Sequence, residues 1–138
     1  MCTLLNSTLV IFTSEIIGRS KGIGGGACVF TKTDLMKIPV LKISELPAEE
    51  KMRILESGQK MQLREFKTIF QELGLPKINK DYSNINPKNV SLDEILPDRR
   101  ELDKIVFEVL GLTEQEQLEV YKAVVELVKN RLVKAGSV

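Results

Sequence analysis

The amino-acid sequence predicts a mainly α fold with about five helices, a small two-strand β element near residues 27–43 and a C-terminal helical hairpin. Apolar residues recur at helical spacing in several segments, most regularly across residues 98–138. Stretches that favour β-structure are short and fall between residues 27 and 43. Apolar residues make up 43% of the chain, with no Trp, five Phe and two Tyr, so we expect an aliphatic core.

The first helix is expected over about residues 6–19. Ser7 and its neighbours Asn6 and Thr8 are good helix caps, and Gly18 stands where glycine commonly ends a helix. The apolar pattern is already running at the start of the chain, so we expect an exposed patch that promotes oligomerisation or docking on another polypeptide. The stripe that forms this patch is Leu5, Leu9, Phe12 and Ile16.

The β element follows a glycine-rich loop, Gly22–Gly26. Residues 27–30 are expected to form the first strand and residues 38–41 the second, with one helical turn at 34–37 between them. Because Pro39 cannot donate a backbone hydrogen bond, the second strand is confined to a sheet edge.

Two helices are expected next, over residues 47–59 and 62–73. Gly58 weakens the first of them near its end, and Gly74 followed by Pro76 stops the second. The second helix carries an apolar face made of Leu63, Phe66, Phe70 and Leu73.

Residues 76–90 lack apolar periodicity and are rich in Asn, Lys and Pro, which is typical of a functional or mobile linker. The C-terminal part is a pair of helices joined by a short turn. Asp98 caps the first helix, Gly111 ends it, and Thr113 with Glu116 matches a capping box that starts the second. The last helix carries a stripe of Leu118, Tyr121, Val125, Val128 and Leu132.

Composition excludes several classes of function. The chain has no His, which removes the commonest general base and transition-metal ligand, and Cys2 and Cys28 lack the spacing of a zinc site. We therefore expect no metal and no cofactor.

The sequence also bears on where the protein acts. The apolar run at Leu9–Phe12 is too short to span a membrane, no targeting segment is evident, and two distant cysteines fit a reducing cytoplasm. A net charge of +1 gives no global attraction to nucleic acid, so any DNA contact must be local.

The best local candidate is the surrounding of the glycine loop. Glycines allow close approach of backbone N–H groups to phosphate, although the run lacks the ending of a phosphate-binding loop and reads better as a turn before a strand. Segment 1–45 holds five basic and three acidic residues. An ordinary solvated surface is the alternative interpretation of this balance. The candidate DNA-binding residues are Arg19, Lys21, Gly24, Gly25, Lys32 and Lys37.

Arg99 and Arg100 form a secondary candidate. Positive charge in the first turn of a helix opposes the helix dipole, and a residue that breaks a local rule is a functional suspect. The alternative is that Asp98, Glu101 and Asp103 pair with the arginines on the surface. The carboxylates at helix starts, including Glu114 and Glu116, are better explained as caps than as acid–base groups.

Both ends of the chain carry short motifs in a recognisable order: Leu4–Leu9, Gly18-Arg19, Gly24–Ala27 and Asp34–Val40, then Leu96–Asp103, Leu110–Thr113 and Tyr121–Val128. The first group resembles the end of the target-recognition domain of TaqI-like and type IIG adenine-specific DNA methyltransferases. The second group is similar to the helical tail of archaeal and bacterial members. The resemblance divides the chain into a target-recognition-like part (1–45), a helical connector (46–75), a linker (76–97) and a C-terminal helical hairpin (98–138).

The resemblance implies a recognition role and not the chemistry. The glycine-rich turn that binds S-adenosylmethionine is missing, and Asn86-Pro87-Lys88 lacks the second proline and the aromatic residue of the Asn-Pro-Pro-Tyr-type motif. We therefore expect a non-catalytic fragment of an N6-adenine DNA methyltransferase from a restriction–modification system. Its expected partners are DNA, bound weakly and locally, and the catalytic part or subunit, with self-association as a further expectation. The alternative is a helical protein-interaction module without a DNA role.

Overall fold

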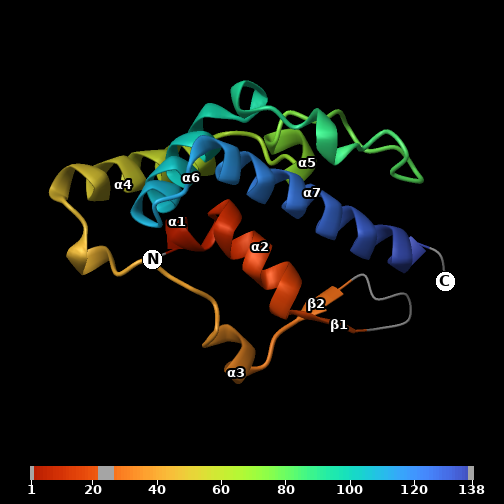
Figure 1. Cartoon of the computed structure of the whole chain (residues 1–138), viewed down its shortest axis with the longest axis horizontal. Helices are drawn as coiled ribbons and strands as arrows, with labels where there is room; N and C mark the ends of the chain where they lie inside the picture. Colours follow the sequence, from red (N-terminus) through yellow and green to blue (C-terminus); the bar gives the residue numbers. More distant parts are fainter. Residues whose placement is uncertain (1, 22–26, 137–138) are drawn as a thin grey trace.

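The computed structural model describes residues 2–21 and 27–136 (Figure 1). These residues are mainly α-helical, as the sequence predicts, and the two strands form one antiparallel pair. The elements in chain order are α1 (Cys2–Leu5), α2 (Thr8–Ile17), β1 (Arg19–Lys21), β2 (Ala27–Val29), α3 (Lys32–Leu35), η1 (Ile43–Glu45), α4 (Ala48–Leu63), α5 (Ile69–Glu72), η2 (Pro87–Asn89), η3 (Leu92–Glu94), α6 (Pro97–Val109) and α7 (Glu114–Gly136), where η denotes a short 3₁₀-helix.

The expected first helix is divided into α1 and α2. Helix α1 ends at Leu5. The Ser7 hydroxyl then caps α2 by accepting a hydrogen bond from the backbone N–H of Val10. The break changes which side chains face inward. Leu5 and Ile16 are exposed, as the predicted patch requires, whereas Leu9 and Phe12 pack half-buried against the core, so half of the predicted exposed patch is wrong.

The β element also differs from the prediction. Residues 27–29 pair with residues 19–21, with Ser20 opposite Cys28, and residues 38–41 form no strand. The preceding segment offers the nearer partner, whereas Pro39 removes a donor from the later one. Residues 39–41 instead help to line an apolar cavity of about 120 Å³ beside α1 and α2.

Helix α4 is longer than expected because Gly58 is a contact point and not a helix end. A β-carbon at Gly58 would lie 2.3 Å from the Thr3 hydroxyl oxygen, so the glycine allows α1 to pack closely on α4. The helix ends where Arg64 adopts an extended backbone.

The expected helix over residues 62–73 is wrong. Residues 62–63 end α4, residues 64–68 are not helical, and α5 begins only after a capping box between Thr68 and Gln71. The predicted apolar face is accordingly split. Phe70 and Leu73 are buried, whereas Leu63 and Phe66 are 89% and 97% exposed.

The two C-terminal helices and the turn between them are confirmed. Gly111 has a positive φ of 71° after α6, and the Thr113–Glu116 capping box opens α7, with both hydrogen bonds to the Glu116 carboxylate at 2.8 Å. The rings of Phe107 and Tyr121 meet edge to face at 5.5 Å. Along its length, however, α7 packs on α2, and α6 packs on α4 (Figure 1).

The core consists of two clusters of buried apolar side chains. The larger one surrounds α7 and includes Phe107, Tyr121 and Val125, and the smaller one joins α1, α4 and α6. Segment 76–97, expected as a linker, contributes Ile85 and Val90, as well as Ile95, to the larger cluster. Its irregular backbone is therefore packed against the helices. None of the helices described in residues 2–21 and 27–136 has the length and apolar character needed to cross a membrane.

Candidate nucleic-acid interface

Residues 18–21 and 27–42 leave the helical body and carry β1, β2 and α3. We call this segment the basic arm. It extends from the end of α2, reaches α3 at its far end and returns toward α4 (Figure 1). The hydrogen bond from the Cys28 thiol to the Ser14 carbonyl, at 3.8 Å, ties its base to α2. The basic arm is also the part of the chain that carries the predicted DNA-binding residues.

The structure places four of the six predicted residues on the arm's described elements. Arg19 and Lys21 lie in β1, at the register positions opposite Val29 and Ala27. Lys32 begins α3, and Lys37 follows that helix. Gly24 and Gly25 lie outside the described residues.

The arm has a strong local excess of positive charge. Residues 18–42 contain five basic residues (Arg19, Lys21, Lys32, Lys37 and Lys42) and a single acidic one, Asp34. Asp34 is 3% exposed, and its carboxylate accepts hydrogen bonds from the Thr31 N–H at 2.9 Å and the Thr31 hydroxyl at 2.7 Å. The capping box of α3 thus holds the only negative charge of the arm away from the surface.

The lysines of α3 remain available to a partner. Lys32 and Lys37 are both exposed, and within the described part of the chain neither forms an ion pair. Lys42, at the end of the arm, pairs with Glu45 at 3.3 Å on the surface. Solvated lysines without carboxylate partners are the groups that neutralise phosphates.

The other acidic residue near the arm is also neutralised. Both oxygens of Glu15 accept hydrogen bonds from Arg131 at 2.8 Å, which joins the end of α2 to α7. This hydrogen bond raises the pKa of Arg131. The carboxylate of Glu15, next to the base of the arm, is therefore paired with a cation.

Exposed apolar side chains accompany the lysines, although they are not among the binding residues predicted from the sequence. Leu35 and Met36 are 55% and 78% exposed, between Lys32 and Lys37. Both residues lie in a short helical turn between charged residues and outside any apolar stripe, and this pattern could have predicted their exposure. The far end of the arm thus presents apolar and cationic groups together.

The secondary candidates do not belong to this surface. Arg99 is 4% exposed, forms an ion pair with Glu72, and donates to the Asn6 carbonyl at 2.8 Å and the Thr8 hydroxyl at 3.2 Å. Arg100 is half-buried and donates to the Gln117 side chain at 2.8 Å. Arg99 therefore ties the start of α6 to α1, α2 and α5, and its guanidinium group is buried away from any DNA contact.

The arginines are part of a buried polar network that sequence reasoning missed. Arg64 pairs with Glu72 at 2.8 Å and with Asp98, which explains why α4 ends at Arg64 and why α5 packs where it does. The centre of the network is Asp103, which is fully buried in α6.

Asp103 accepts three hydrogen bonds from two other helices. The Thr8 N–H and hydroxyl donate at 2.7 and 2.6 Å, and the Tyr121 hydroxyl donates at 3.0 Å. Burial raises the pKa of the Asp103 carboxyl, against the opposing effects of Arg99 and of these hydrogen bonds. Burial also raises the pKa of Tyr121. Because donors surround the carboxylate and solvent does not reach it, this network holds α2, α6 and α7 together.

Within the described ranges, no group of three or more His, Cys, Asp or Glu residues is placed to hold a metal ion. Comparisons of the chain with protein-family models, with curated proteins and with solved structures find no match.

Proposed function

We propose that this chain is a non-catalytic, DNA-positioning part of an N6-adenine DNA methyltransferase of a restriction–modification system, acting in the cytoplasm. In this proposal the basic arm contacts the DNA backbone, and the helical body packs on the catalytic part or subunit. The observation that carries the proposal is the charge of the arm, which holds five basic residues and one buried acid. The motifs that resemble the methyltransferase family supply the enzyme class.

The rest of the chain argues for a local contact. From residue 46 onward there are 15 basic and 16 acidic residues, so the helical body provides no attractive field for DNA. Electrostatic binding must then depend on the arm alone, and a few lysine and arginine side chains can neutralise only a few phosphates.

The test is binding of a labelled DNA duplex, followed by fluorescence anisotropy as a function of salt. With about two to four phosphates neutralised, the logarithm of the association constant should fall with the logarithm of salt at a slope of about −2 to −4. The affinity at physiological salt should lie in the non-specific range, roughly 10⁻⁴–10⁻⁶ M. Absence of binding at low salt, or binding that is insensitive to salt, would contradict the proposal.

A second function is supported by a different observation. Large apolar side chains are exposed on the outside of α4 as well as on the arm, and soluble proteins usually cover such surfaces with a partner. A helical protein-interaction module without a DNA role is therefore the alternative. It predicts that charge on the arm has no effect on function, whereas substitutions on α4 abolish it.

A further inference from the structure

Helix α4 carries apolar side chains on two opposite sides. Ile54 on its inner side is buried in the smaller core cluster, with Met61 packed half-buried beside it. On the outer side, Met52 and Leu55 are each 59% exposed, and Leu63 is 89% exposed. At about 100° per residue these three positions fall on one narrow face of the helix. We call Met52, Leu55 and Leu63 the outer stripe.

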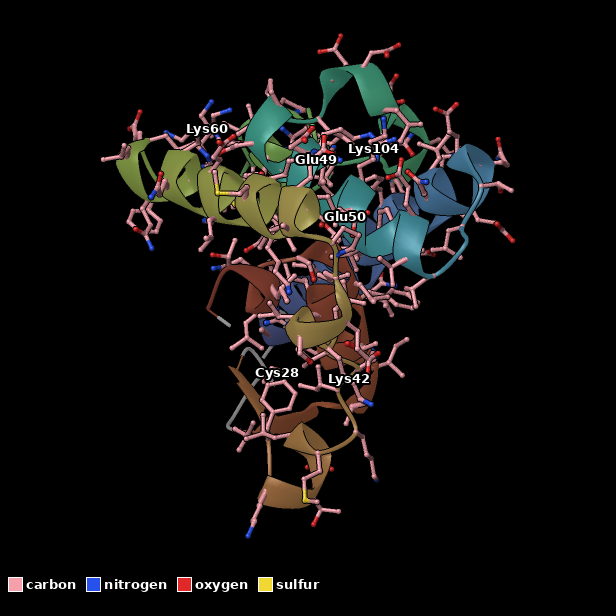
Figure 2. The ribbon with its side chains drawn as sticks, turned by 90° about the vertical axis from the view of Figure 1, so that its left-hand side faces the viewer. Cys28, Lys42, Glu49, Glu50, Lys60 and Lys104 are labelled. Atoms are coloured by element: carbon pink, nitrogen blue, oxygen red, sulfur yellow. The ribbon has the colours of Figure 1, made fainter. Side chains whose placement is uncertain are left out.

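The outer stripe lies open on one side of the molecule. Figure 2 shows α4 along this side, with Glu49 and Glu50 at its N-terminal end and Lys60 toward its C-terminal end. A surface helix normally has one apolar face, which points to the core. A second apolar face indicates that this helix packs on another helix in a larger assembly.

We propose that the occupant of the outer stripe is the α4 helix of a second copy of the chain, packed antiparallel across a two-fold axis. An axis that crosses α4 between residues 57 and 58 places Met52 of one copy opposite Leu63 of the other, and Leu55 near the centre. Such an interface is self-complementary, since each copy contributes the same stripe.

Charge along the stripe selects this arrangement. Glu56 and Lys60 border the stripe on the same side, one helical turn apart, on either side of the proposed axis. In the antiparallel pair, Glu56 of each copy therefore lies beside Lys60 of the other. A parallel pair would instead place the Glu56 and Lys60 side chains of the two copies on opposite edges of the contact, so that no Glu56 would meet a Lys60 of the other copy. Within the described residues, neither Glu56 nor Lys60 forms an ion pair inside the chain, so both charges are available across the interface.

The contact is small. One face of a 16-residue helix, about 24 Å long, supplies less than the roughly 800 Å² per partner that is usual in stable complexes. The dimer should therefore be reversible and should form at micromolar to millimolar concentrations. This inference does not depend on the DNA-binding proposal, because the outer stripe lies on α4 and not on the basic arm.

The test is sedimentation of the full chain at rising concentration, with charge-reversed variants. In the antiparallel dimer, Glu56→Lys places a lysine at position 56 beside Lys60 of the other copy, and Lys60→Glu places a glutamate at position 60 beside Glu56 of the other copy. Each variant alone should therefore dimerise about tenfold more weakly than the unchanged chain. Mixed in equal amounts, the two variants should form a heterodimer at least as stable as the original dimer, because every pair is again of opposite charge.

Two further variants complete the design. Leu63→Ser should weaken the dimer, and reversal of the exposed pair on α6, Lys104→Glu with Glu108→Lys, should leave it unchanged. Helical content measured by circular dichroism verifies that each variant folds. A chain that stays monomeric at millimolar concentration, or reversed variants that fail to rescue each other on mixing, would overturn the proposal and assign the stripe to a different partner.

Discussion

At the scale of single residues, one buried carboxylate organises the helical body. Asp103 belongs to α6, receives hydrogen bonds from Thr8 at the start of α2, and receives another from Tyr121 of α7. From the sequence, Asp103 reads as a surface neighbour of Arg99 and Arg100. Its burial depends on the packing of both α2 and α7 against α6 at this point, which the local sequence cannot predict. The network therefore explains why two arginines stand in the first turn of a helix.

Asp103→Asn tests this role. The amide NH₂ would meet the Thr8 donors, and the negative charge that faces Arg99 would be lost, so we expect the free energy of unfolding to fall by about 3 kcal/mol. Tyr121→Phe removes one hydrogen bond and should cost about 1 kcal/mol. Urea unfolding measures both, with Asp93→Asn on the exposed surface as the control, expected within about 0.5 kcal/mol of the unchanged chain. An Asp103→Asn chain as stable as the control would refute the structural role.

At the scale of elements, two glycines with positive φ among the described residues offer a matched comparison. Gly74 has a φ of 80°, and an added β-carbon would lie 2.5 Å from the Glu94 side chain and 2.8 Å from its carbonyl oxygen. Gly111 has a φ of 71°, with nothing within 4 Å of the same position. Both turns need a left-handed backbone, but only the turn after α5 is also packed against a neighbour.

Gly111→Ala should therefore cost about 1 kcal/mol from backbone strain alone. Gly74→Ala adds a steric clash with Glu94 and should cost about 3 kcal/mol. Thermal unfolding of the two variants side by side gives the comparison. Equal losses in the two variants would show that packing of segment 76–97 on α5 contributes nothing at this point.

The elements that the sequence predicted best are those defined by local chemistry. The Thr113–Glu116 capping box and Gly111 fix the turn between α6 and α7, because caps act within one helical turn. The helix expected over 62–73 failed for a long-range reason, since the ion pairs of Arg64 with Glu72 and Asp98 fix where α4 ends. Strand pairing depends on a second segment, and the pattern at 38–41 did not indicate that residues 19–21 are the partner of residues 27–29.

The candidate site was predicted in part for the same reason. Exposed Lys32 and Lys37 could be selected from local charge, because no carboxylate in the described part of the chain forms an ion pair with either of them. The buried state of Arg99 depends on Glu72, Asn6 and Thr8, which lie 27 to 93 residues away in sequence. Charge composition alone therefore identifies an accessible cation only where no distant partner binds it.

At the scale of the whole molecule, the excess of positive charge and the outer stripe lie on different parts of the chain. The basic arm extends from one end of α2, and the outer stripe of α4 lies on the helical body, whose charges nearly balance. Two distinct contacts follow from this arrangement: an electrostatic contact through the arm and an apolar contact through α4. In a DNA-positioning role, the arm determines affinity for the duplex and the body determines assembly.

The most direct test of the DNA-positioning role compares two double charge reversals. Lys32→Glu with Lys37→Glu alters the arm, and Lys77→Glu with Lys88→Glu alters exposed lysines of segment 76–97 while changing the net charge equally. Lysines of α7 are less suitable as controls. The ammonium group of Lys129, for example, donates to the Ile85 carbonyl at 2.6 Å, so its reversal would also remove a hydrogen bond within the fold. Duplex binding at low salt is measured for both variants and for the unchanged chain.

We predict that the arm variant loses about tenfold or more in duplex affinity and has a shallower salt slope, since each lysine neutralises about one phosphate. The control variant should bind DNA nearly as well as the unchanged chain. Equal losses of affinity in both variants would mean that only net charge matters. A larger loss in the control variant would place the DNA contact on the helical body. Either result would contradict the role assigned to the basic arm.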